Sequence, residues 1–249
     1  MPLHFSALEW IAAFFAVLCI GISKSGFTGL SLITVIIMAR LFPPRESTGV
    51  VLPLLIVGDI CAVVAFQRHA NWRQIRRMLP PAVVGIVAGC AIMYFIPDRK
   101  FGSVIGYIIL LLTALQGLRL WKPTAFEHVP HSPAFAWSMG VWSGVTTLLA
   151  NAAGPIMSLY FLAVNLPKYE FIGTAAWFFL LVNLIKVPFS AWLGLIHGSS
   201  LLFNVIMAPA VGLGAFLGQR LIKIVPQRLF EILLVIFAGL ASLRLIGLF

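Results

Sequence analysis

Three charged side chains lie inside apolar stretches of this sequence, where the cost of a charge makes it informative. Lys24 stands in the run "GISKSGFTG", and Asp59 and Lys186 lie deep within two long apolar stretches. In a membrane helix such a charge costs about 3 kcal/mol or more and usually marks an ion or substrate pathway. Two ammonium groups and one carboxylate therefore predict an anion site with its own counter-ion.

The small residues around Lys24 favour a break between two helices. Ser23, Ser25 and Gly26 flank the lysine, and a break here would leave backbone N–H groups free beside the positive end of the next helix. We expect these residues and Lys24 to bind an anion together. The alternative is that the first apolar stretch ends here and Lys24 extends to the cytoplasmic interface.

A second break is predicted in "ANAAGP", residues 150–155. Proline suits the first turn of a helix, because the N–H that it lacks has no partner there, so Gly154 and Pro155 predict a helix start. Asn151 can donate its amide to an anion, and we expect it to bind the anion together with the helix start at Gly154 and Pro155. An ordinary turn between two tilted helices is the alternative.

Asp59 has a polar counterpart at an equivalent place in the second half of the chain. Asn183 fills that place, and Lys186 lies one helical turn further on, on the same face. We expect Asn183 and Lys186 to bind the anion and Asp59 to carry a proton or to gate the site through an ion pair with Lys24 or Lys186. A purely structural ion pair between the halves remains the alternative.

Composition identifies the class of protein. The chain has 249 residues, of which 61% are hydrophobic and 10% charged, whereas about a quarter of the residues of a soluble domain are charged. We therefore expect an all-α polytopic membrane protein, whose net charge of +10 reflects basic loops rather than nucleic-acid binding. No nucleophile–base set, nucleotide loop or metal-ligand pattern is present, so we expect no enzyme activity, cofactor or metal.

Ten apolar stretches follow a short, short, long, long, long order that occurs twice. The predicted stretches are 7–22, 26–39, 46–66, 78–96, 101–118, 134–150, 152–166, 171–196, 199–218 and 229–248. Landmarks recur at a nearly constant offset, because Pro44, Glu46, Gly49 and Asp59 correspond to Pro167, Glu170, Gly173 and Asn183.

Five stretches in each half would place the second half upside down in the membrane. We expect a first repeat over 1–120, a cytoplasmic linker over 121–133 and an inverted second repeat over 134–249, with short broken or re-entrant helices opening each repeat. This is the architecture of many secondary transporters, whose substrate site lies at the repeat interface.

Basic residues are unevenly divided between the two sides. If 67–77 is cytoplasmic, so are 119–133, 167–170 and 219–228, and these segments hold most of the Lys and Arg residues. The positive-inside rule then predicts an inner-membrane protein with both termini on the outer side.

Several motifs resemble the TauE/SafE sulfite exporter family. They are "GISKSGFTG" at 21–29, "PPRESTGVVLPLLIVGDICAV" at 43–63 and "LPPAVVGIVAG" at 79–89, with "AGP" and "APAVGLGAFLG" in the second half. The resemblance covers nearly the whole chain. It implies transport of small sulfur-containing anions such as sulfite or sulfonates. Where the family often has a second glycine after the lysine, this chain has Ser25.

Together these features predict a secondary transporter that moves a small sulfur-containing anion across the cytoplasmic membrane by alternating access. Protons are the candidate coupling ion, and the lipid bilayer is the other expected partner. A passive anion channel and a non-transporting membrane anchor or assembly protein are the alternatives. The sequence leaves direction and oligomeric state open.

Overall fold

The computed structural model describes residues 5–27, 29–122 and 132–224, with scattered positions between 232 and 247. The described regular structure is helical: α1 (Ala7–Ser23), α2 (Leu30–Leu41), α3 (Pro44–Phe66), the short 3₁₀ helix η1 (Gln67–His69), α4 (Trp72–Phe95), α5 (Asp98–Trp121), α6 (Pro133–Ala150), α7 (Gly154–Ala163), α8 (Lys168–Trp192) and α9 (Gly198–Ile224). Most of the tenth predicted stretch lies outside the described residues.

Helix lengths follow the predicted order of short and long elements. Within the described residues, five helices are long and apolar enough to cross a membrane, namely α3, α4, α5, α8 and α9. By contrast, α2 has 12 residues and rises only about 18 Å, against the about 30 Å of a hydrocarbon core. The all-helical membrane fold is therefore as predicted, with short helices in both halves.

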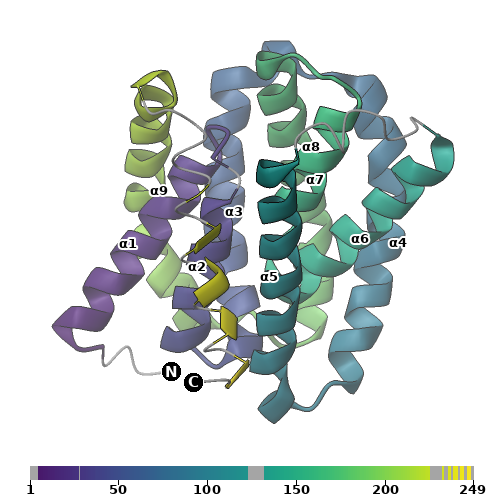
Figure 1. The fold of residues 1–249 in the computed structure, drawn as a ribbon. Helices are drawn as coiled ribbons and strands as arrows, with labels where there is room; N and C mark the ends of the chain where they lie inside the picture. Colours follow the sequence, from purple (N-terminus) through teal and green to yellow (C-terminus); the bar gives the residue numbers. More distant parts are fainter. Residues whose placement is uncertain are drawn as a thin grey trace.

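The long helices α3 and α8 lie side by side in the middle of the molecule and run in opposite directions (Figure 1). Gly49, near the start of α3, packs against the backbone of Leu195, beyond the end of α8. Gly173, near the start of α8, packs against the backbone of Phe66 and His69 at the end of α3. Each helix is thus fixed by a glycine at its start.

Two parallel helix pairs flank this centre, and both cross at glycines. Gly21 of α1 meets Gly214 of α9, and a Cβ atom at Gly21 would overlap the carbonyl oxygen of Val211. Gly85 of α4 meets Gly144 of α6 in the same manner. Small residues let helix backbones approach closely in membranes, and these glycines allow both close crossings.

Both predicted helix breaks are present. Between Ser23 and Leu30 the chain turns through Gly26, whose φ of 110° is readily adopted only by glycine. Between Ala150 and Gly154 it turns through Asn151, whose φ is 51° and whose short polar side chain tolerates the left-handed conformation.

Two helix starts differ from the apolar stretches that predicted them. The helix α2 begins at Leu30 rather than at residue 26, because Gly26 belongs to the turn. The helix α4 begins at Trp72, before the apolar run, because the side chain of Asn71 accepts a hydrogen bond from the backbone N–H of Gln74 and caps the helix. Basic residues therefore occupy the first turns of α4.

The α3–α4 connection and the start of α8 share one end of the molecule. The backbone N–H of Asn71 donates to Thr174 Oγ1 at 2.9 Å, and Asn71 Nδ2 donates to Glu170 at 3.3 Å. These bonds place 67–72 beside 168–174, as the distribution of basic residues predicts.

Candidate functional site

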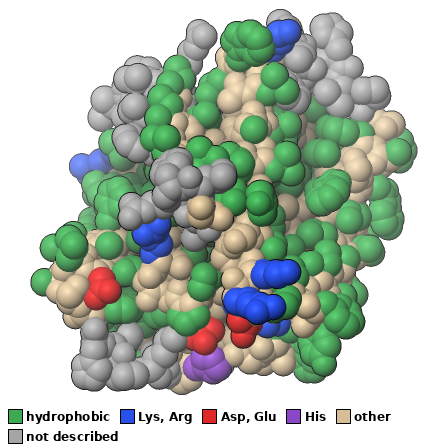
Figure 2. All heavy atoms as spheres, turned by 60° about the horizontal axis from the view of Figure 1, so that its bottom comes forward, with side chains coloured by type: hydrophobic (Ala, Val, Ile, Leu, Met, Phe, Trp, Pro, Cys, Tyr) green, Lys and Arg blue, Asp and Glu red, His purple; other side chains and the backbone are tan. Residues whose placement is uncertain are grey.

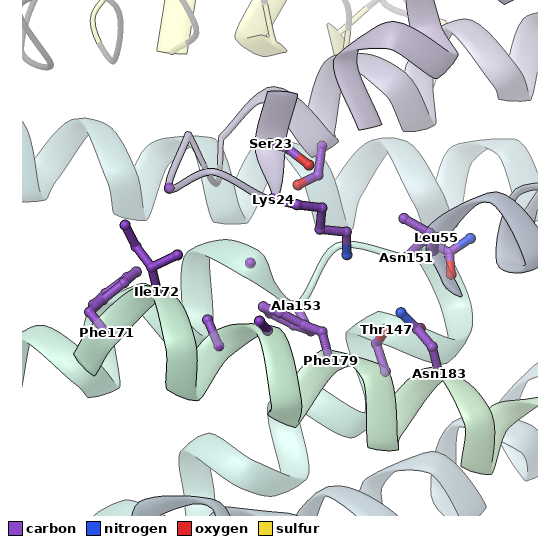
Figure 3. Close-up of a pocket in the computed structure, with 15 residues that line it drawn as sticks. Ser23, Lys24, Leu55, Thr147, Asn151, Ala153, Phe171, Ile172, Phe179 and Asn183 are labelled. Atoms are coloured by element: carbon purple, nitrogen blue, oxygen red, sulfur yellow. The ribbon is translucent and has the colours of Figure 1, made fainter. Parts of the chain in front are cut away.

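A cavity lies where the two helix breaks approach α3 and α8 (Figure 3). Its volume is about 50 Å³, several times the space of about 10–15 Å³ that one water requires. Its walls are Ser23, Lys24, Gly26, Ser31, Leu55, Thr147, Asn151, Ala153, Gly154, Phe171, Ile172, Ala175, Ala176, Phe179 and Asn183. Elements from both halves of the chain therefore build one site.

Lys24 points into this cavity and forms an ion pair with α3. Its Nζ lies 2.7 Å from Asp59 Oδ1, and the exposed fractions of the two side chains are 11% and 0%. This distance is that of a charge-assisted hydrogen bond. The side chain lies inside the protein, and the described geometry does not match an interface anchor.

Asn183 connects the carboxylate to the second lysine. Its Nδ2 donates to Asp59 Oδ2 at 2.6 Å, and its Oδ1 accepts from Lys186 Nζ at 3.2 Å. Asp59 of α3 and Asn183 of α8, which the sequence predicts to be equivalent positions, are thus in direct contact. A single amide orients a carboxylate on one side and an ammonium group on the other.

Lys186 is more deeply buried than Lys24 and has neutral partners. Its Nζ donates to Asn151 Oδ1 at 2.6 Å and to Thr147 Oγ1 at 3.2 Å, in addition to Asn183, and 1% of the residue is exposed. Lys186 does not line the cavity. It lies behind Asn151 and Asn183 and donates to the side-chain oxygens of both. The amide N–H groups of these two residues donate instead to Thr48 and Asp59.

Asn151 ties the second helix break to α3. Its Nδ2 donates to the backbone oxygen of Thr48 at 2.9 Å, while its oxygen accepts from Lys186. Both ends of the amide are therefore used by the protein in this conformation, and an anion would have to exchange with one of these bonds to reach it.

Two features would give the site a positive electrostatic potential. In their ordinary ionised forms, Lys24, Lys186 and Asp59 leave one positive charge in excess. Residues at the starts of two helices also line the cavity, Ser31 in α2 and Gly154 in α7, and helix starts present free N–H groups and a positive dipole end. The arrangement is suited to an anion.

The remainder of the cavity is apolar and follows α8. Phe171, Ile172, Ala175, Ala176 and Phe179 form this wall, which leads from the polar end toward the start of α8. The ring centroid of Phe179 lies 5.2 Å from Lys24 Nζ, so the aromatic face contributes a cation–π contact. The site therefore has a charged polar end and an uncharged apolar end.

Most residues predicted for the site converge on it. Ser23, Lys24, Gly26, Asn151, Gly154 and Asn183 line the cavity, and Asp59 and Lys186 support it from behind. Ser25 and Pro155 do not line it. The hydroxyl of Ser25 donates instead to the carbonyl of Ala215 at 3.4 Å, on α9, because Lys24 and Ser25 point to different sides of the turn.

Thr147 and Phe179 are site residues that sequence reasoning missed. Thr147 precedes Asn151 by four residues, and Phe179 precedes Asn183 by four, so helical spacing places each beside a predicted residue. This spacing could have identified both residues. The hydrogen bond from Asn151 to the Thr48 carbonyl could not be predicted from the sequence, because every residue has a backbone oxygen.

Comparison with known proteins agrees with this geometry. The model of the family "Sulfite exporter TauE/SafE" matches residues 13–245. A relative from Cupriavidus necator, named "Probable sulfite/organosulfonate exporter TauE", is 23% identical over 184 residues, which cover 72% of this chain and 70% of that protein. No solved structure matches the chain. Because the family match spans almost the whole sequence, the chain belongs to the TauE/SafE sulfite exporter family of membrane exporters and is not an enzyme.

Proposed function

We propose that this protein is a secondary transporter for a small sulfur-containing anion, with an organosulfonate as the best-fitting substrate. The observation that carries the proposal is the cavity at which both helix breaks, Lys24 and two helix starts converge, with the buried Lys186 behind it. A sulfonate or sulfite group would lie near Lys24, with Ser23, Asn151 and Asn183 as neutral partners. The name of the Cupriavidus relative includes both of these anions.

The apolar end of the cavity favours an anion with a carbon group. Phe171, Ile172, Ala175 and Ala176 offer no hydrogen bonds from their side chains, so bare sulfite would leave this wall without a matching contact. An organic group placed there would remove apolar surface from water, at about 25 cal/mol per Å².

Asp59 supplies a means of coupling. While the carboxylate is ionised, Lys24 is paired with it; a proton on Asp59 would release the ammonium group to the anion. We therefore propose that a proton and the anion bind together. A second route to the same end is direct competition, in which the anion replaces the carboxylate at Lys24.

Alternating access would arise from two inverted repeats, 1–120 and 134–249, joined by the linker 121–133. The glycine crossings of α1 with α9 and of α4 with α6 are counterparts under this repeat, as are the glycine contacts at the starts of α3 and α8. Two equivalent crossings would let one repeat rock against the other.

The described conformation has the features expected of one end state. The cavity extends along α8 from Asn183 to Phe171, toward the end that holds 67–72. Toward the other end, Gly49 packs on Leu195 and Asn151 is bonded to Thr48. With the basic loops in the cytoplasm and the termini outside the cytoplasmic membrane, this is an inward-facing state.

Binding and flux together test the proposal. Purified protein would be heated with sulfite, methanesulfonate and longer alkanesulfonates, since a ligand that binds only the native state raises the unfolding temperature. Reconstituted vesicles would then be assayed for anion flux with and without a pH gradient. Saturable flux that a pH gradient drives uphill supports the transporter, whereas flux that never exceeds electrochemical equilibrium indicates a channel. No binding and no flux would refute the proposal.

A further inference from the structure

An apolar groove and a charged pocket adjoin one another at the end of the molecule opposite the α3–α4 connection. The groove lies between α4 and α8 and is lined by Val87, Cys90, Ala91, Tyr94, Phe95, Pro188, Phe189 and Trp192. The pocket is lined by Arg45, Glu46, Tyr94, Asp98, Trp192, Leu193, Gly194 and Leu195. Their volumes are about 510 and 400 Å³, and neither belongs to the substrate site.

Tyr94 and Trp192 form the wall that the groove and the pocket share. Their rings stack with centroids 5.9 Å apart, and their exposed fractions are 61% and 70%. Tyrosine and tryptophan with one apolar side and one polar edge gather at the level of lipid headgroups. The pair therefore marks the boundary between a groove at the depth of acyl chains and a pocket at the depth of headgroups.

The pocket contains charges of both signs. Arg45 donates to Asp98 at 2.6 Å and to the backbone oxygen of Met93 at 2.7 Å. Glu46, one residue further along, has no ion pair or hydrogen bond with any described residue. The three side chains thus leave one carboxylate in excess. Figure 2 shows basic and acidic side chains gathered beside apolar surface at this end of the molecule.

We propose that the groove and the pocket together bind one phospholipid with a primary-amine headgroup. An acyl chain would lie in the groove, the phosphate would contact Arg45, and the ammonium group would contact Glu46 and Asp98. An anionic lipid without an amine would bring its charge to a pocket that already has excess negative charge. A choline headgroup has no N–H to donate to Glu46.

Matched lipids test this assignment. Phosphatidylethanolamine, phosphatidylcholine and phosphatidylglycerol with identical acyl chains would be added to the purified protein in detergent, and bound lipid would be measured by native mass spectrometry together with the unfolding temperature. We expect phosphatidylethanolamine to bind best and to stabilise the protein most. Equal binding of the three lipids would overturn the proposal, because lipids that merely surround the protein show no such preference.

Two variants locate the site. Glu46→Gln leaves the Arg45–Asp98 pair intact and should weaken phosphatidylethanolamine binding by about fivefold, the size of a partly exposed ion pair, without changing phosphatidylcholine. Val87→Trp should fill the groove and weaken every lipid, whereas the control Val205→Trp, at a residue that is 72% exposed on α9, should not. An unchanged preference in Glu46→Gln, or a dimer that Val87→Trp disrupts, would refute the lipid site.

Discussion

Lys24 and Lys186 lie near one another inside the protein but differ in burial and in the chemistry of their partners. Lys24 lines the cavity and forms an ion pair with the carboxylate of Asp59 at 2.7 Å. Lys186 lies behind the cavity and donates to three neutral oxygens. Asn183 links the two lysines, because it bonds both to Asp59, the partner of Lys24, and to Lys186 itself.

The difference indicates a division of roles. A lysine held by an exchangeable counter-ion can move to a substrate anion, and its release changes the charge balance of the site. A lysine held by three oriented acceptors fixes those acceptors and adds a stationary positive charge. We therefore propose that Lys24 contacts the substrate directly and that Lys186 positions the site.

The largest effect is expected at the counter-ion. Asp59→Asn should lower the free energy of unfolding by about 3–5 kcal/mol, because it leaves Lys24 buried without a partner charge. An added sulfonate should restore part of this loss, so the ligand-induced rise in unfolding temperature should exceed that of the wild type. The measurement is thermal unfolding with and without methanesulfonate. An equal or smaller rise would show that Lys24 does not exchange partners.

The next effect concerns Lys24 itself. Lys24→Met should weaken anion binding by about 2 kcal/mol, the net value of a hydrogen bond to a charged group, or roughly 30-fold. It should also destabilise the protein, since Asp59 is left unpaired. The double variant Lys24→Met/Asp59→Asn should recover stability without recovering binding, as measured by unfolding and by isothermal titration. Recovered binding in the double variant would assign the anion to another group.

Lys186→Met should have a smaller effect on binding and a different effect on stability. Because the lost charge is separated from the anion by an amide, we expect anion affinity to fall about fivefold, or about 1 kcal/mol. The variant also leaves the oxygens of Thr147, Asn151 and Asn183 without their donor, so it should lower the free energy of unfolding by about 1–3 kcal/mol. Unlike the loss in Lys24→Met, this loss should not be recovered by Asp59→Asn. Titration and unfolding of Lys186→Met beside Lys24→Met compare the two lysines directly. Identical losses in both variants would abolish the distinction between them.

The smallest effect should come from Thr147, which accepts from Lys186 at 3.2 Å. Thr147→Val removes that acceptor and should cost about 1 kcal/mol of stability with little change in anion affinity. Thr113→Val is the matched control, because the buried Thr113 hydroxyl has no hydrogen-bond partner in the described chain and its loss should cost nothing. Denaturant unfolding of both variants measures the difference. Equal costs would mean that Thr147 does not hold Lys186.

The sequence predicted the helix breaks and the polar residues near them more fully than it predicted their partners. Glycine, serine and proline act locally on the backbone, so the breaks at 24–29 and 151–153 follow from residue type. Whether Asp59 pairs with Lys24 or with Lys186 depends on how α1 and α8 approach α3, and both pairings were compatible with the sequence. The structure selects Lys24.

Side-chain direction within a turn was also beyond the sequence. Lys24 and Ser25 are adjacent and polar, yet Lys24 faces the cavity and Ser25 faces α9, where a Cβ at Gly218 would crowd its hydroxyl. The outcome depends on a helix that lies 190 residues away along the chain. Local propensity carries no information about such a contact.

The glycine crossings have a consequence for how this architecture can diversify. At Gly21 and Gly85 the facing partners are backbone atoms of α9 and α6, so no compensating side-chain change on the partner helix can make room for a larger residue. The apolar wall at Ala175 and Ala176, by contrast, borders open space, where larger or smaller side chains can be exchanged. The positions that fix the helix packing are therefore separate from those that shape the cavity, so substitutions at the wall can change the cavity without disturbing the helix crossings.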